Sequence, residues 1–211
     1  MGYFYTDSNG NRRYVPEGEQ YQDDDPRSFT DSKGNKSSFD KVEPKKFMKD
    51  FGVAKRSQPE NMRWRVDDTS HTEEDYSHDK LYVSDRGSVI AVTPDGDIIS
   101  VCVNAKSDPR DSARTLLEWA VKNGGKKFDS YEGNYGVYTH LGFEPVSWCK
   151  WNGDYAPYDW DANRDYPEDI IFFKYTGKPF GMKIDDWKAS VKCSSDYDEA
   201  MEKRDREIKN G

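Results

Sequence analysis

Two runs of β-branched residues give the clearest pattern along the chain. They occupy residues 87–93 and 98–103, and the turn sequence Pro94-Asp95-Gly96-Asp97 separates them. Val and Ile suit a pleated, half-buried backbone, and a Pro-Asp-Gly turn brings two such runs back on each other. The pattern therefore predicts an antiparallel hairpin.

An amphipathic helix is predicted directly after the hairpin, starting near residue 107 or 108. Pro109 suits its first turn, where a missing N–H costs no intrahelical hydrogen bond. Apolar residues then recur at helical spacing: Leu116, Leu117, Ala120 and Val121. A glycine pair at residues 124–125 is the stop signal.

Strands and one short helix alternate through the rest of the middle of the chain. Strands are predicted at residues 62–66, 80–83, 127–131, 143–151 and 170–175, and the short helix at residues 134–141. Residues 152–169 form a loop rich in Asp and aromatic residues. Loops of this length inside a compact domain are usually functional or disordered.

The two ends of the chain are more polar than its middle. Residues 1–60 are expected to be an extension with a short helix at 44–55, and their aromatic start forms either a hairpin or a flexible arm. Residues 179–211 are expected to be a charged tail whose helix has little apolar face. One domain is thus predicted over residues 61–178.

Composition supports a folded core. The mean hydropathy of -1.09, with 34% hydrophobic and 34% charged residues among 211, would by itself indicate disorder. However, 6 Trp, 14 Tyr and 10 Phe can bury a large apolar area per residue. The sequence therefore predicts a compact, aromatic-rich core with polar ends.

Charge and cysteine content limit the classes of partner. A net charge of -8 disfavours nonspecific binding to nucleic acid or to an anionic membrane, and leaves open a protein partner that meets an acidic surface. The three cysteines form no CxxC pair, which argues against a zinc site or a disulfide framework. A reducing, cytoplasmic setting is expected.

The segment NYGVYTHLGF at residues 134–143 resembles part of the GNAT acyltransferases, in which an Asn opens a short helix, a Tyr follows, and a Gly-Phe pair leads into the next strand. The preceding LLEWA, residues 116–120, resembles the cofactor helix of that family. The resemblance implies an α/β (α+β) fold with a mixed, mostly antiparallel sheet flanked by helices and polar N- and C-terminal extensions.

The resemblance also implies acetyl-CoA as cofactor and an amine-bearing small molecule or protein as acceptor. The pantetheine arm would lie along Val101, Cys102 and Val103. Tyr138 would be the general acid for the departing thiolate, and Asn134 would touch the cofactor. The diphosphate would meet the following helix start, at Arg110, Asp111, Ser112, Ala113 and Arg114.

Two carboxylates depart from the pattern of the family. Asp108 stands where an Arg or Gln is usual, and Asp111 stands where a Gly is usual. A carboxylate facing a phosphate at about 4 Å would cost roughly 1 to 4 kcal/mol, which Arg110 and Arg114 could offset. Alternatively, the Asp residues cap the helix and face solvent, or the loop no longer binds CoA.

The loop at residues 152–169 offers a candidate acceptor site at Tyr155, Tyr158, Asp159 and Trp160. Aromatic rings and carboxylates both attract a cationic amine. The same composition also suits a solvated loop that holds itself in place through Asx turns. His71 and His78 lack HExxH spacing, so no metal is expected.

Two functions therefore compete. The first is an N-acyltransferase. The second is a non-catalytic GNAT-like module that binds a protein partner, and the texture of the chain resembles accessory or effector proteins of phages and prophages. Tyr138 is ambiguous in the same way, because an aromatic residue on a helix beside a sheet also serves as core packing.

Overall fold

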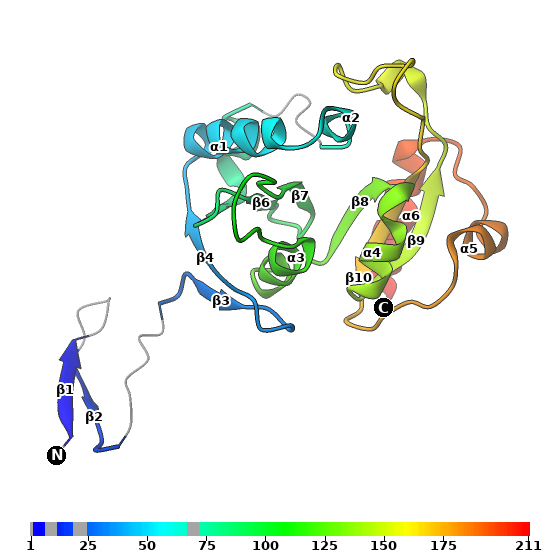
Figure 1. Ribbon diagram of the computed structural model, residues 1–211. Helices are drawn as coiled ribbons and strands as arrows, with labels where there is room; N and C mark the ends of the chain where they lie inside the picture. The colour runs from blue at the N-terminus through cyan, green and yellow to red at the C-terminus, as the bar shows by residue number, and fades with distance from the viewer. Residues whose placement is uncertain (1, 7–11, 19–24, 67–71) are drawn as a thin grey trace.

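Two antiparallel sheets form the body of the protein in the computed structural model, which describes residues 2–6, 12–18, 25–66 and 72–211. The first sheet has the order β3 (Ser28–Thr30), β4 (Lys36–Lys41), β5 (Lys80–Ser84), β6 (Val89–Val92) and β7 (Ile98–Cys102). The second has the order β8 (Lys127–Tyr131), β10 (Ile170–Tyr175) and β9 (Phe143–Cys149). Helices flank both sheets (Figure 1), so the predicted α+β class is confirmed.

Each sheet carries helices on both faces. In the first sheet α1 (Pro44–Ser57) and α3 (Ala113–Lys122) take opposite faces; in the second, α4 (Tyr135–His140) and α6 (Tyr197–Asn210) do so. Strand alternation explains this arrangement. Leu81 of β5 packs in the cluster that holds Phe47 of α1. The next residue, Tyr82, faces Trp119 of α3, with ring centroids 5.3 Å apart.

β7 and β8 run parallel, because α3 carries the chain back from the end of one to the start of the other. Among the described residues, one parallel backbone bridge joins the two sheets, between Asp97 and Lys127. Beyond it the strands belong to different sheets and separate toward their C-terminal ends (Figure 1). The sheets thus open away from each other from a shared base.

An extra residue in β7 bends this strand where it borders the opening. The register with β6 shifts between the pairs Ala91–Ile99 and Val89–Cys102. The chain therefore advances three residues on β7, from Ile99 to Cys102, where it advances two on β6. Ser100, inside the shift, has a φ of 53°, a region that residues other than Gly seldom adopt. Such bulges increase local twist and re-aim the residues around them.

Parts of both chain ends belong to the body, which differs from the predicted extensions. β4 pairs with β5, and Phe47 of α1 is fully buried. At the other end, α6 lies on the second sheet, where Ala200 is fully buried and the Tyr197 ring packs on Phe172 at 4.9 Å. The buried face of α6 escaped the sequence pattern because one of its members is a charged residue, Arg204.

Two local expectations had opposite outcomes. The hairpin alternative for the aromatic start is confirmed, since β1 (Tyr3–Thr6) pairs with β2 (Arg12–Val15), and Figure 1 draws this hairpin apart from the two sheets. The strand predicted at residues 62–66 was wrong: α2 (Glu60–Arg63) overlaps the start of this range and a turn follows. The apolar pattern of this segment reflects packing instead of a strand, since Trp64 is only 2% exposed and packs on Tyr131 and Trp151. A further helix, α5 (Ile184–Ser190), precedes α6.

Candidate functional site

The C-terminal end of β7 is in contact with the segment that follows α1. The side-chain amide of Gln58 donates a hydrogen bond to the backbone carbonyl of Val103, and its nitrogen lies 4.0 Å from the sulfur of Cys102. The Cys102 side chain is buried on the α1 face, and burial raises the pKa of its thiol to about 12. At the predicted pantetheine edge, residues 101–103, the backbone and not the Cys102 side chain is therefore the candidate for contact with a cofactor. Gln58 already occupies one group of this backbone, the Val103 carbonyl.

The end of β8 is covered by aromatic residues. Trp64 packs on Tyr131, the last residue of β8, with ring centroids 4.8 Å apart, and on Trp151 at 5.8 Å. Trp151 in turn packs on Trp160 at 5.4 Å. Residues 58–64 thus touch both strand ends, and the Trp64–Trp151–Trp160 contacts connect them to the loop at residues 152–169.

Two of the predicted site residues meet through a third that the sequence did not single out. Ser130 of β8 accepts a hydrogen bond from the Asn134 amide at 3.1 Å and is also hydrogen-bonded to Tyr138. The Tyr138 ring packs edge-on against Phe128 at 4.7 Å and against Phe173 at 5.8 Å. Burial raises the pKa of the Tyr138 hydroxyl, and the hydrogen bond with Ser130 opposes the shift. The hydroxyl therefore keeps its proton at neutral pH.

Asp111 has a structural place that the sequence did not predict. Its side chain is fully buried, and its carboxylate accepts hydrogen bonds from Ser84 at 2.6 Å, from Arg86 at 3.1 Å and from Ser37. The charge is thus neutralised inside the first sheet. This corrects the assignment of Asp111 to the cofactor loop, because a fully buried carboxylate can neither contact a diphosphate nor repel it at close range.

The start of α3 is held by its own cap and by the turn between β3 and β4. Ser112 accepts a hydrogen bond from the Thr115 amide at 3.1 Å, which makes it the N-cap. Arg114 reaches Glu118 at 3.2 Å and the Ser32 hydroxyl at 3.1 Å. Of the predicted phosphate-loop residues, Arg110, Ser112, Ala113 and Arg114 lie at this helix start, and Arg110 and Ser112 are exposed.

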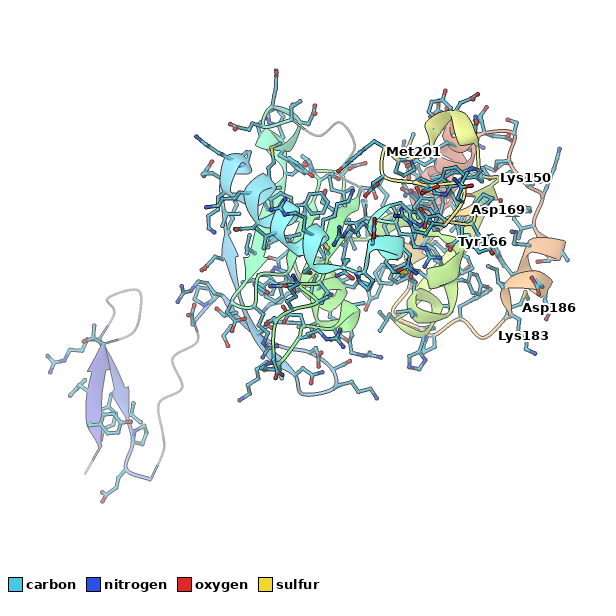
Figure 2. All side chains as sticks on the ribbon, turned by 45° about the horizontal axis from the view of Figure 1, so that its top comes forward. Lys150, Tyr166, Asp169, Lys183, Asp186 and Met201 are labelled. Atoms are coloured by element: carbon cyan, nitrogen blue, oxygen red, sulfur yellow. The ribbon has the colours of Figure 1, made fainter. Side chains whose placement is uncertain are left out.

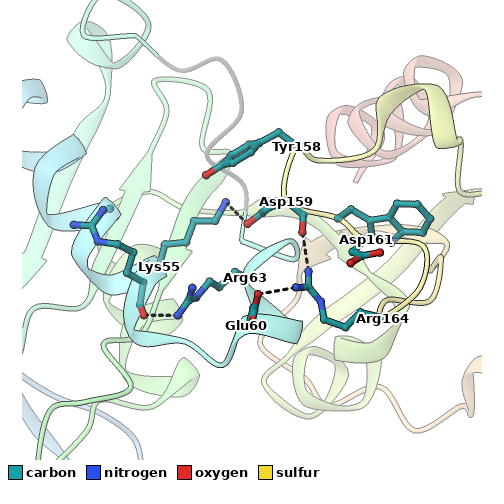
Figure 3. Close-up of a pocket in the computed structure, with 10 residues that line it drawn as sticks. Lys55, Glu60, Arg63, Tyr158, Asp159, Asp161 and Arg164 are labelled. Carbon is teal, nitrogen blue, oxygen red and sulfur yellow. Dashed lines mark hydrogen bonds and ion pairs between the residues drawn. The ribbon is translucent and has the colours of Figure 1, made fainter.

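A cavity of about 450 Å³ lies between the α1–α2 segment and residues 158–164 (Figure 3). Three of the four residues predicted for acceptor binding line it: Tyr158, Asp159 and Trp160. The fourth, Tyr155, is 84% exposed and lies outside the lining. Tyr166 of the same loop, labelled in Figure 2, is also exposed.

Ion pairs cross this cavity from one wall to the other. Lys55 of α1, buried, lies 3.3 Å from the Asp159 carboxylate and 5.2 Å from the centre of the Tyr158 ring. Arg164 of the loop pairs with Glu60 of α2 at 3.2 Å (Figure 3). The loop predicted as acidic therefore faces basic residues, and the cavity has charges of both signs.

Comparison with known proteins gives one coarse likeness. No protein-family model and no curated protein matches the chain. A solved structure described as a probable acetyltransferase of the GNAT family, from Chromobacterium violaceum ATCC 12472, matches with a TM-score of 0.39 and 11% sequence identity. The match covers 75% of this chain and 94% of that one. At this level of similarity, any function must be argued from the residues.

Several residues of the site carry no sequence signal of their own. Lys55, Arg56 and Arg63 read in the sequence as ordinary basic residues at helix ends, and Gln58 as a linker residue. For Gln58 and Lys55 the role follows from contacts with residues about 45 and 100 positions away, Val103 and Asp159. A hint was available in Lys55, since it falls on the same helical face as Phe47, Phe51 and Ala54, all of which are buried.

Two other kinds of site receive no support. Within the described ranges there is no group of three or more His, Cys, Asp or Glu side chains arranged to hold a metal ion. In those same ranges no helix is both long and apolar enough to cross a bilayer. His71 falls outside the described residues.

Proposed function

We propose that the chain is an acyl-CoA-dependent N-acyltransferase that moves an acetyl group to an amine. One relationship carries the proposal: the parallel strands β7 and β8 are bridged at Asp97–Lys127 and lie in separate sheets beyond it. The bulge at Ser100 borders this opening on one side, and the Asn134–Ser130–Tyr138 cluster belongs to the strand and helix on the other. Backbone outliers of this kind concentrate at functional sites.

The start of α3 fits the diphosphate of the cofactor. Apart from Thr115, whose amide donates to Ser112, its first backbone N–H groups have no intrahelical partner, and the helix dipole favours an anion there. Arg110, exposed beside it, adds positive charge, while Asp111 is turned inward and neutralised by Arg86. The pantetheine arm would follow the backbone at Val101 and, once Gln58 releases it, at Val103.

Acetyl-CoA, when bound, supplies an acetyl group activated as a thioester. Tyr138 holds a proton at neutral pH and supplies it to the sulfur as the carbon–sulfur bond breaks. Asp159, on the cavity side, takes the proton that the amine loses as its nitrogen bonds to the acetyl carbon. Residues 58–64 exclude water from the strand ends, which limits hydrolysis of the thioester.

Calorimetric titration with acetyl-CoA tests this proposal directly. Binding is expected, with a matching rise in thermal stability: at 100 times the dissociation constant the gain is about 2.7 kcal/mol. Coenzyme A should bind as well, whereas AMP alone should bind more weakly because it cannot follow β7. No heat and no thermal shift at millimolar acetyl-CoA would exclude the acyltransferase.

One observation favours the second candidate, a non-catalytic binding module. The hydrogen bond from Gln58 to the Val103 carbonyl uses an acceptor that the cofactor would need. If acetyl-CoA does not bind, this contact is a permanent part of the core and the cavity serves a partner or ligand without chemistry. The same titration separates the two functions.

A further inference from the structure

The cavity between the α1–α2 segment and residues 158–164 has mostly basic residues on the helix wall and mostly acidic residues on the loop wall; the exceptions, Glu60 and Arg164, pair with each other. On the helix wall, Arg56 and Arg63 line it, and neither has a carboxylate within ion-pair distance among the residues that the structure describes. Arg63 instead donates to the backbone carbonyls of Gln58 and Arg56, both at 3.0 Å, which fixes its guanidinium at the wall.

The loop wall has carboxylate oxygens with spare hydrogen-bonding capacity. Asp161 lines the cavity and, in the described part of the chain, forms no ion pair; its carboxylate accepts one hydrogen bond, from the Asn163 amide at 2.9 Å. Asp159 uses one carboxylate oxygen for Lys55, while its other oxygen has no hydrogen-bond partner among the described residues. Figure 3 shows both carboxylates on the side opposite Arg63.

Aromatic side chains also line the cavity. Tyr158 and Trp160 line the cavity, and the Trp160 ring packs against Trp151 in a tilted arrangement. Flat rings of this kind bind a planar side chain with little loss of conformational entropy. The volume of about 450 Å³ is within the range of sites for small molecules.

We infer that this cavity binds a zwitterion, an aromatic α-amino acid, with its carboxylate at Arg56 and Arg63 and its ammonium group at Asp159 and Asp161. A ligand with one charge would pair with one wall only, whereas a zwitterion has a partner of opposite charge on each wall. The role of that amine as the acetyl acceptor rests on the proposed function, but the binding itself does not.

Three ligands of one shape test the inference on the full chain, in the absence of acetyl-CoA. L-Phenylalanine has both charges, 2-phenylethylamine lacks the carboxylate, and 3-phenylpropionate lacks the amine. Calorimetry at low salt should show binding of L-phenylalanine, with each analogue about tenfold weaker or more. No binding of L-phenylalanine, or equal binding of either analogue, would overturn the inference.

A charge-removing pair of variants locates the site. Arg56→Gln is expected to weaken L-phenylalanine about tenfold and to leave 2-phenylethylamine unchanged. Lys45→Gln, which removes one exposed charge from the same helix away from the cavity, should change neither. Unchanged L-phenylalanine binding in Arg56→Gln would refute the assignment. Because no acetyl-CoA is present, a failure here leaves the acyltransferase proposal to its own titration.

Discussion

Asp97, one residue before β7, forms a parallel backbone bridge with Lys127, the first residue of β8. The base of the opening between the sheets therefore depends on this pair, and α6 reinforces it. Arg204 donates to the Asp97 carboxylate at 3.1 Å with only 1% of its side chain exposed, and Asp205 lies 3.1 Å from the Lys127 ammonium. A helix from the charged end of the chain thus ties the two sheets together.

Removal of Arg204 should destabilise the whole body. Arg204→Ala leaves Asp97 partly buried without its guanidinium partner, and breaking a buried ion pair in this way costs about 3 to 5 kcal/mol. Chemical denaturation should show this loss. Arg206→Ala, an exposed residue of the same helix paired with Glu202 at 3.9 Å, should cost less than about 1 kcal/mol. Equal effects would mean that α6 does not clamp the sheets.

The contact between Lys127 and Asp95 should give the stability a specific dependence on pH. A hydrogen bond from Lys127, with another from Thr93, lowers the pKa of Asp95 from 3.8 to about 2. Because the folded-state pKa is the lower one, the stabilisation is present above about pH 4 and is lost as the pH falls toward 2. Urea midpoints across this interval should fall less steeply in Asp95→Asn than in the parent chain. Asp154→Asn, in an exposed loop, should retain the parent slope.

Asp111→Asn should act on stability and not on cofactor affinity. The substitution removes the charge that Arg86 balances and disturbs hydrogen bonds from Ser37 and Ser84, at a cost of about 2 to 3 kcal/mol. At a temperature where the variant is folded, its dissociation constant for acetyl-CoA should equal that of the parent. Tighter binding would show that the carboxylate does face the phosphates. Asp108→Asn, at an exposed position of the same loop, serves as the control for stability.

Gln58→Ala tests whether the β7 edge receives the cofactor. The variant frees the Val103 carbonyl, and acetyl-CoA should bind roughly fivefold to tenfold more tightly because one internal hydrogen bond no longer has to be broken. Ser57→Ala removes a neighbouring contact, in which the Ser57 hydroxyl accepts from the Ala105 amide at 2.8 Å, and leaves Val103 engaged. It should lower stability without tightening the binding. If both variants bind acetyl-CoA as the parent does, the cofactor does not use this carbonyl.

The spacing of apolar residues predicted the elements that depend on residues close together in the sequence. The hairpin of β6 and β7 and the apolar stripe of α3 both follow from short-range spacing. The environment of Asp111 cannot be predicted from short-range spacing. Its partners Ser84, the last residue of β5, and Arg86 lie 27 and 25 positions away in the sequence. A buried Asp and an exposed Asp have the same sequence letter, so only tertiary contacts distinguish a cofactor loop from a structural one.

The cavity was predictable in part for the same reason. The aromatic and acidic residues of the loop are adjacent in sequence, so Tyr158, Asp159 and Trp160 could be grouped before the fold was known. The opposite wall comes from α1, about a hundred positions earlier, and its residues gain meaning only when Lys55 meets Asp159. Sequence alone therefore predicted the acidic and aromatic residues of one wall and missed the basic residues Lys55, Arg56 and Arg63 of the other.

Tyr138→Phe tests whether this residue acts as a general acid or only packs in the core. The ring contacts with Phe128 and Phe173 are kept, so stability and acetyl-CoA affinity should change little. If the hydroxyl supplies the proton to the sulfur, the turnover should fall by roughly a hundredfold or more, the usual contribution of a positioned general acid. Tyr135→Phe is the matched control, because it removes a hydroxyl on the same helix that donates to the Met182 carbonyl at 3.1 Å, a contact outside the cluster with Ser130. Turnover that falls equally in both variants would indicate a general loss of helix α4, and turnover that is unchanged in Tyr138→Phe would leave this tyrosine as core packing alone.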